Sequence, residues 1–273
     1  MSADTRFAHV NDIDLAYSES GSGEPIIFVH GAISDHRVWA PQIAYLSERY
    51  RCIALDQRYF GGSWPGGEDK FTLATHAKDL CQFLRVTVDR PVHVVATSYG
   101  SGVVLASAVS CPPLFKSLFL SEPFLPSLVA DPAEKSVVGQ AFRSLAPVAN
   151  SLSDGNELLA AERFFDWTSH AGAFASLREE FKVVVYHNAR TLALQLAAPP
   201  PDLAATHVAQ LTLPITLSLG ELANPFFKVL VSAAHRLLPH AQVQSISNAH
   251  HCSSFENPAE FNAALLRHIA AAA

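Results

Sequence analysis

The sequence predicts an α/β protein with a mostly parallel sheet and a helical segment inserted into it. Short apolar runs alternate with longer segments of helical spacing, which is typical of parallel strands joined by helical crossovers. The runs lie at 26–29, 52–55, 92–96, 118–120, 215–219 and 243–246. From Leu125 to about Ala205 no such run occurs, although a crossover needs far fewer residues.

The remaining elements follow in chain order. Residues 7–18 alternate apolar and polar around Asn11-Asp12, which predicts a hairpin. Helical spacing is present at 38–49, 72–86, 100–110, 132–148, 156–168, 173–197, 225–238 and 257–271. We therefore predict a core domain of residues 1–124 and 206–273 and a helical cap of residues 125–205. The cap would cover the carboxyl edge of the sheet, where open α/β sheets bind ligands.

Composition narrows the function classes. Hydrophobic residues make up 49% of the 273 residues, which is enough for a large core. The net charge is −6 and no Lys/Arg stripe occurs, so nucleic acid is not an expected partner. No apolar stretch reaches the ~18 residues of a membrane span, and the N-terminus does not resemble a signal peptide. We expect a cytoplasmic protein that binds a small molecule and no membrane. The sequence is compatible with either a monomer or a homodimer.

Residues 92–102, VHVVATSYGSG, predict a nucleophile. A strand runs directly into a small-x-Ser-x-small turn followed by a helix, and such a sharp turn exposes its serine at the top of the sheet. Ser98 is therefore the candidate nucleophile. An ordinary turn with a serine N-cap is the alternative for this segment considered alone.

Five motifs in this order resemble those of the α/β-hydrolase family over nearly the whole chain. They are His30-Gly31, the segment from Asp56 to Ser63, the serine turn with Ala96 in place of the usual glycine, Ala249-His250-His251, and Glu256-Asn257-Pro258. The resemblance implies an eight-stranded, mostly parallel sheet flanked by helices.

The resemblance also implies the partners of Ser98. His251 is the expected general base, because Phe255 to Pro258 align it better than His250 with the family pattern. Ser98 chemistry builds negative charge on a carbonyl oxygen, which two backbone N–H groups can stabilise. The residue after the nucleophile, Tyr99, and the residue after His-Gly, Ala32, are the expected donors of this oxyanion hole.

The acid of the triad departs from the family pattern. Relatives carry Asp in a Gly-x-x-Asp pattern after the strand at 215–219, and here Ala223 stands at that position. Glu122 and Glu221 both keep the chain order Ser, acid, His. We favour Glu122, which ends the preceding strand, over Glu221, and a site in which neither contacts His251 stays open.

Several further side chains are candidates for the pocket or its support. His30, Phe124, Trp167 and His250 are expected around the substrate, although His30 also fits a structural hydrogen-bonding role. Asp56 and Arg58 are expected to tie loops together beneath the site. No coenzyme motif and no metal-ligand spacing occur, so we predict neither a cofactor nor a metal.

These residues predict a serine hydrolase that cleaves a carboxylic ester or lactone of a medium-sized, largely apolar molecule through an acyl-enzyme. The same triad serves C–C hydrolases, acyltransferases, perhydrolases and lyases in the family, and fold does not choose among them. A ligand-binding protein or a non-hydrolytic cyclase on the same scaffold is the third hypothesis.

Overall fold

A computed structural model describes residues 5–65, 71–201 and 203–272. The described residues form one eight-stranded sheet with the order β1-β2-β4-β3-β5-β6-β7-β8. Its strands are β1 (Arg6–Val10), β2 (Ile13–Ser20), β3 (Glu24–Val29), β4 (Tyr50–Leu55), β5 (Val92–Thr97), β6 (Phe115–Ser121), β7 (Ile215–Gly220) and β8 (Gln242–Ile246). Only the pairs that involve β2 are antiparallel. The predicted fold class is confirmed, with its hairpin and a strand at each of the six apolar runs, although β8 is mostly exposed.

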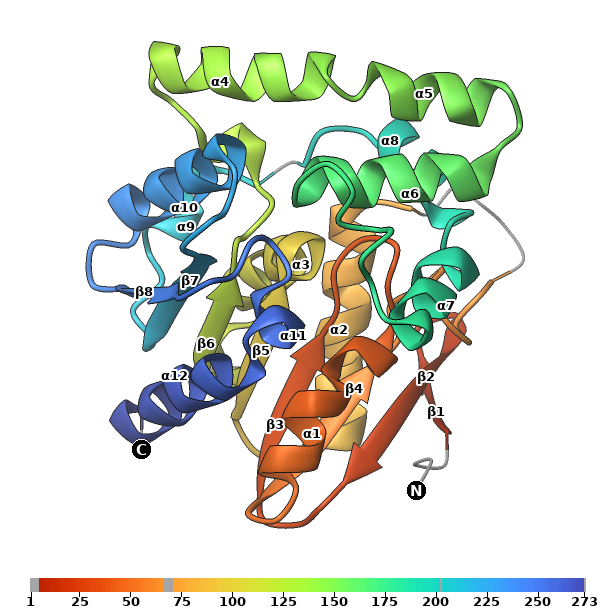
Figure 1. The fold of residues 1–273 in the computed structure, drawn as a ribbon. Helices are drawn as coiled ribbons and strands as arrows, with labels where there is room; N and C mark the ends of the chain where they lie inside the picture. The colour runs from red at the N-terminus through yellow and green to blue at the C-terminus, as the bar shows by residue number, and fades with distance from the viewer. Residues whose placement is uncertain (1–4, 66–70, 202, 273) are drawn as a thin grey trace.

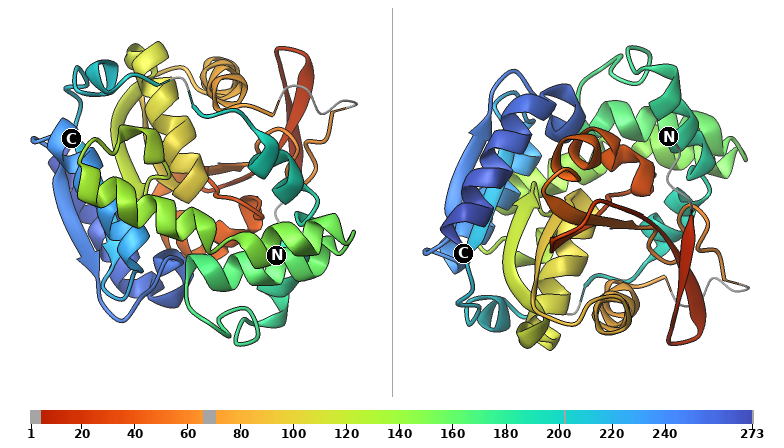
Figure 2. Two further views of the ribbon diagram at one scale, coloured as in Figure 1. Left: turned by 90° about the horizontal axis from the view of Figure 1, so that it is seen from above. Right: turned by 90° about the horizontal axis from the view of Figure 1, so that it is seen from below.

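Helices cover both faces of the sheet because its central strands are apolar on both faces. One face packs against α2 (Leu73–Thr87) and α3 (Ser98–Ser110), the other against α1 (Ala40–Leu46) and α12 (Pro258–Ala271). Successive residues of β3 point to opposite faces of the sheet: Ile27 belongs to the first hydrophobic cluster and Phe28 to the second. Figure 2 shows these helices on opposite sides of the strands. The short helices η1 (His36–Trp39), η2 (Pro112–Leu114) and α11 (Ser253–Glu256) and the longer α10 (Pro225–Leu237) complete the core.

A helical insertion, residues 126–208, separates β6 from β7. It contains η3 (Pro126–Leu128), α4 (Pro132–Arg143), α5 (Ala146–Ser153), α6 (Glu157–Thr168), α7 (Glu179–His187), α8 (Thr191–Ala197) and α9 (Ala205–Val208). Figure 1 shows α4, α5 and α6 as a layer above the carboxyl ends of the parallel strands. The insertion therefore lies where a cap over a ligand site would lie.

Two predicted helices of this insertion are each split in two. The segment 132–148 breaks after Arg143, because Pro147 has no N–H to bond the Arg143 carbonyl and its ring crowds that group. The segment 173–197 begins only at Glu179 and breaks around Asn188, whose side chain bonds to the core domain. Tertiary contacts thus set these boundaries.

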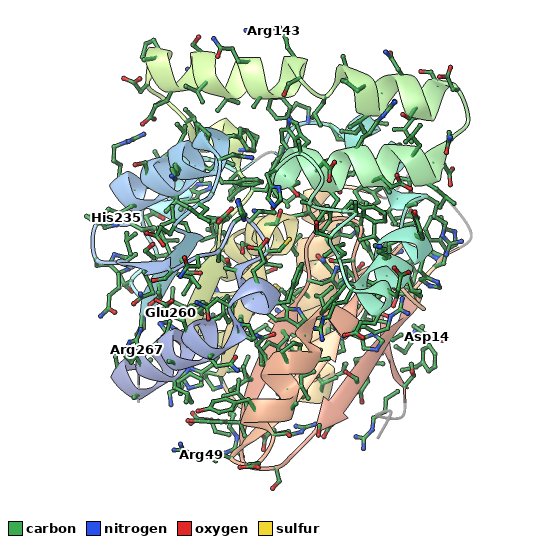
Figure 3. All side chains as sticks on the ribbon, in the orientation of Figure 1. Asp14, Arg49, Arg143, His235, Glu260 and Arg267 are labelled. Carbon is green, nitrogen blue, oxygen red and sulfur yellow. The ribbon has the colours of Figure 1, made fainter. Side chains whose placement is uncertain are left out.

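Many charged side chains lie on the surface. Arg49, Arg143 and Arg267 are exposed and project from three different edges of the molecule (Figure 3). Across the described ranges, every helix is too short or too polar to cross a bilayer.

A buried polar chain lies at the amino ends of the central strands. Ser117 on β6 bonds both to His93 Nδ1 at 2.6 Å and to His268 Nε2 at 2.8 Å. Thr216 on β7 bonds to His268 Nδ1 at 2.8 Å. Burial disfavours the charged imidazole and lowers the pKa of His268 to about 4. This histidine is therefore neutral in the folded protein at neutral pH.

The buried His268 should make the fold sensitive to acid. Its pKa is lower in the folded state than in the unfolded state, so its stabilisation is complete above pH ~6.5 and is lost as the pH falls toward 4. Lowering the pH from 7 to 5 should reduce the free energy of unfolding by ~2 kcal/mol through this one group. In urea denaturation, His268→Gln should lose less stability than wild type over this interval by that amount. The exposed His9→Gln is the control, and equal losses in all three proteins would contradict the assignment.

Candidate active site

Ser98 lies at a strained junction between strand and helix. It is the first residue of α3, directly after β5, and its φ of +53° lies in the left-handed region that L residues rarely adopt. The turn is tight: a Cβ on Gly100 would come within 2.2 Å of the His30 carbonyl oxygen. Only glycine fits at position 100, which explains the small residue two places after the serine. The predicted serine turn thus has the geometry of a nucleophile elbow.

The register of β5 and β6 places Glu122 beside Ser98. Thr97 pairs with Ser121 in these parallel strands, so Ser98 and Glu122 are the next residues on their strands. Glu122 also has a left-handed backbone, with φ +45°, and its side chain is fully buried. Its Oε1 accepts a hydrogen bond from the Gly220 N–H at 2.9 Å. This bond fixes the carboxylate at the carboxyl edge of the sheet.

His251 completes a buried pair with Glu122. Its Nδ1 donates to Glu122 Oε2 at 2.5 Å. The imidazole also stacks on the Phe227 ring, with centroids 3.8 Å apart and planes at 15°. The hydrogen bond and the stacked ring orient the imidazole, and Nε2 remains as the nitrogen that can accept a proton. Such a pair can hold a general base in one tautomer.

The loop that carries His251 is held by two other glutamates. Glu221 Oε2 accepts from the Asn248 N–H at 3.0 Å, and Glu256 Oε2 accepts from the His250 N–H at 2.5 Å. Glu221, the second candidate acid, is therefore bound to the loop backbone in this structure and does not bond to His251. Gly220 allows the loop to approach, because a Cβ there would come within 2.1 Å of the His250 carbonyl oxygen.

The loop after β3, residues 30–35, lies against Ser98 and is called the oxyanion loop below. A Cβ on Gly31 would be 3.1 Å from the Ser98 Cβ. His30 is fully buried, donates from Nδ1 to the Gly31 carbonyl at 2.8 Å and accepts from the Gln57 N–H at Nε2. Desolvation lowers the pKa of His30, which keeps this ring neutral. The loop thus places the Ala32 backbone near the nucleophile.

Tyr99 has a separate anchor. Its hydroxyl lies 2.6 Å from Nδ1 of the fully buried His76, and its ring stacks on Phe71. Desolvation lowers the pKa of His76 to about 3, so the imidazole is neutral at physiological pH. The side chain of Tyr99 therefore points into the core, which leaves the expected oxyanion role to its backbone N–H.

A cavity of about 70 Å³ lies between the sheet and the insertion, and both Ser98 and His251 line it. The oxyanion loop supplies one wall through Gly31, Ala32, Ile33 and Ser34. Two helices of the insertion supply the opposite wall, through Phe164, Phe165, Thr168, Phe181, Val184 and Val185. No Asp, Glu, Lys or Arg belongs to this lining among the described residues. The cavity therefore favours a neutral, apolar group.

The four further residues expected around the substrate do not line this cavity. His30 is sealed beneath the oxyanion loop. The Phe124 ring packs against Phe142 and Phe226. Trp167 donates from Nε1 to the Ala141 carbonyl. The His250 ring lies against the His170 ring, with centroids 4.3 Å apart. The spacing of residues in the sequence does not predict where these side chains point, because their direction depends on how the insertion packs on the core domain.

The wall residues of α7 were not predicted individually. Phe181, Val184 and Val185 belong to the segment EFKVVVYH, whose apolar residues at helical spacing indicate a buried face. That spacing is a usable signal for a buried face. It does not say whether the face meets the core of the insertion or a ligand.

The chain belongs to the α/β-hydrolase fold family. The family model described as alpha/beta hydrolase fold matches residues 24–258, which is most of the chain. This match agrees with the fold and with the strand–serine–helix turn described above.

Individual relatives match either a shorter part of the chain or the whole chain at low sequence identity. An acetyltransferase component of an acetoin cleaving system from Cupriavidus necator is 33% identical over 150 residues, which are 54% of this chain and 40% of that protein. The match thus spans about two fifths of that relative. Among solved structures, a bromoperoxidase from Bacillus anthracis has a TM-score of 0.82 at 21% identity, covering 97% and 99% of the two chains. An esterase from Thermogutta terrifontis has a TM-score of 0.78 at 21% identity, covering 99% of each. These structural likenesses show the shared fold.

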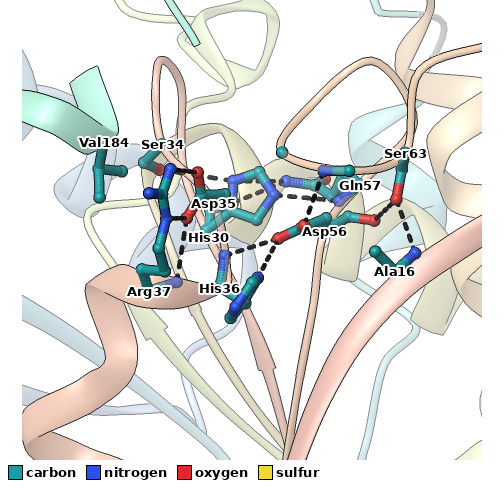
Figure 4. A network of polar contacts seen from close by, with 12 residues as sticks. Ala16, His30, Ser34, Asp35, His36, Arg37, Asp56, Gln57, Ser63 and Val184 are labelled. Carbon is teal, nitrogen blue, oxygen red and sulfur yellow. Dashed lines mark hydrogen bonds and ion pairs between the residues drawn. The ribbon is translucent and has the colours of Figure 1, made fainter. Parts of the chain in front are cut away.

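Outside the cavity, Asp35, His36 and Asp56 form a cluster whose ligand-type atoms lie within 4.8 Å of one another. Their carboxylates are already bonded within the protein. Asp35 is held by the Arg37 guanidinium, and Asp56 accepts from the His36 N–H and Nδ1 at 2.8 and 2.7 Å (Figure 4). The positive charge of Arg37 opposes a cation there. The cluster therefore acts as an internal network that joins loops, which agrees with the structural role expected for Asp56. Arg58 is likewise buried and pairs with Asp12 and Asp79.

The two candidate acids can be separated by amide substitution. Glu122→Gln keeps an acceptor for Gly220 but turns an amide N–H₂ toward His251 Nδ1, which favours the tautomer that cannot accept a proton at Nε2. We expect the rate at which a fluorophosphonate labels Ser98 to fall by about 10²–10⁴-fold, the usual contribution of a general base. Glu221→Gln should label at close to the wild-type rate. Equal rates for Glu122→Gln and wild type would contradict the role of Glu122.

Proposed function

We propose that this hydrolase acts on neutral carboxylic esters or lactones with a small acyl group, through a Ser98-His251-Glu122 triad. The observation that carries the proposal is the buried His251–Glu122 pair, which shares one cavity with the left-handed Ser98. A serine needs an adjacent base that is itself oriented by a third group to become a nucleophile at neutral pH.

In this proposal Ser98 Oγ attacks the carbonyl carbon while His251 Nε2 takes its proton. The backbone N–H groups of Ala32 and Tyr99 bind the oxygen that becomes negative. Collapse of the tetrahedral intermediate breaks the ester bond, and His251 returns the proton to the departing alcohol. A water molecule then loses a proton to His251 and attacks the acyl-enzyme, which releases the acid and regenerates Ser98.

Size and charge of the cavity narrow the substrate class. A cavity of roughly 150 Å³ holds a benzene ring, and this cavity has about half that volume. The hydroxyl groups of Ser34 and Thr168 in the lining are already donated to backbone carbonyls. A charged acyl group would be desolvated there with no Asp, Glu, Lys or Arg among the described lining residues to pair with it, which is costly. A short, neutral acyl group therefore fits best.

Covalent labelling tests the nucleophile. A fluorophosphonate should add once to wild type, as read by intact mass, because an activated serine attacks its phosphorus. The adduct should be absent from Ser98→Ala. Folded wild-type protein without an adduct, or a Ser98→Ala variant that still labels, would sink the proposed function and favour the ligand-binding hypothesis.

A series of p-nitrophenyl esters tests the acyl group. We expect kcat/KM to fall by at least about tenfold from acetate to octanoate, because each chain must enter the small cavity. Phe181 is buried in the wall and stacks on Phe255 with centroids 4.7 Å apart, so Phe181→Ala should enlarge the cavity and move the optimum to longer chains.

The exposed Phe7→Ala is the matched control and should keep the wild-type profile. If Phe181→Ala is too unstable to purify, Phe181→Leu should give a smaller shift in the same direction. A wild-type preference for octanoate, or the same profile in all variants, would contradict the assignment of the cavity as the acyl site.

A further inference from the structure

The oxyanion loop contains a backbone conformation that it cannot hold by itself. Ile33 has φ +42°, and a β-branched residue in the left-handed region is a marked outlier. Such strain persists only where the surroundings over-determine the conformation. Ile33 follows Ala32 directly, so whatever holds Ile33 also restrains the backbone that carries the Ala32 N–H.

The first support is the apolar core of the insertion. The Ile33 side chain is 3% exposed and packs in a cluster whose other buried members all come from residues 145–192. They include Leu145, Phe164 and Val185. Ile33 is thus the buried residue from outside the insertion in this cluster, and Ala32, Cys252 and Phe255 pack against the cluster.

The second support is Asn188, at the break between α7 and α8. Its Nδ2 donates to Asp35 Oδ2 at 2.7 Å, and its Oδ1 accepts from the Gly61 N–H at 2.8 Å. A further bond from Nδ2 to the Val184 carbonyl at 2.9 Å uses its second N–H. The side chain is 1% exposed, so these bonds are shielded from water. One amide of the insertion therefore binds the oxyanion loop and the loop after β4 together.

Asp35 is prepared for this contact. Its Oδ1 accepts from Arg37 Nε at 2.8 Å and its Oδ2 from Arg37 Nη2 at 2.6 Å (Figure 4). Burial by itself would raise the pKa of Asp35, but the Arg37 bonds and charge outweigh it and lower the pKa to about 2. The acceptor that Asn188 meets is therefore an ionised carboxylate, which makes the bond stronger than one between neutral groups.

From these contacts we infer that Asn188 is a positioning residue, which holds the oxyanion loop in its strained conformation through Asp35 and so couples the helical insertion to catalysis at Ser98. The inference rests on the proposed function, because it assigns the Ala32 N–H to the oxyanion. Asn188 itself acts on the reaction only through the loop.

Asn188→Asp tests the contact. It keeps the shape and the acceptor for Gly61, but it sets a carboxylate against Asp35 and also removes the bond to the Val184 carbonyl. With p-nitrophenyl acetate we expect kcat to fall about 10- to 100-fold and KM to change little, since the lost interaction is made mainly in the transition state.

Tyr186→Phe is the matched control. Tyr186 lies on α7 and bonds to Glu162 on α6 at 2.6 Å, so its loss removes a tie within the insertion and leaves the oxyanion loop untouched. It should keep kcat within about twofold of wild type. The fraction of chains that a fluorophosphonate finally labels counts folded sites, and kcat is expressed per labelled site. Asn188→Ala, measured in the same way, replaces the aspartate variant if that one does not fold.

The outcomes separate the two proposals. A wild type that forms no Ser98 adduct and does not turn over the ester overturns the proposed function, and the inference with it. A labelled, active wild type with unchanged kcat per site in the Asn188 variants overturns the inference alone. So does an equal loss in Tyr186→Phe or a change confined to KM.

Discussion

The pairing of β5 with β6 is the constraint on which the candidate site depends. Neighbouring parallel strands end at one edge, and the register that sets Thr97 opposite Ser121 brings the next residues, Ser98 and Glu122, to the same height. Both then leave their strands through a left-handed backbone, with φ +53° and +45°. A shift of one residue in this register would turn one of the two side chains to the other face of the sheet. The apolar cores on both faces oppose such a shift, so the packing of the whole sheet supports the geometry at its edge.

The sheet and the serine turn were predictable from the sequence because each depends on local pattern. Buried strands appear as short apolar runs, and the turn at Ser98 demands small residues at fixed positions. The choice between Glu122 and Glu221 was not local. It depends on the loop that carries His251, and there Glu221 bonds to the Asn248 N–H, which leaves Glu122 as the carboxylate at the imidazole. The chain order alone left both open.

The pocket wall was the least predictable part. Apolar residues at helical spacing indicated buried faces, but Trp167 and Phe124 turned into the aromatic packing around Phe226, while Phe181 turned to the cavity. These directions follow from how short helices dock on one another and on the core. The break of the predicted helix at Asn188 has the same origin, because its amide bonds to Asp35 and Gly61, which are more than 120 residues away in the sequence.

The insertion therefore has two roles that share one set of contacts. Its helices α6 and α7 line the cavity, which limits the acyl group in the proposed function, and its apolar cluster and Asn188 contact the loop that would hold the Ala32 N–H. Val185 takes part in both, since it lines the cavity and packs in the cluster with Ile33. A change in the wall that lets α7 move is then expected to move Ala32 as well, so that specificity and rate change together. A substitution in the cavity wall that leaves the cluster around Ile33 intact is expected to change substrate specificity without changing the rate of the chemical step.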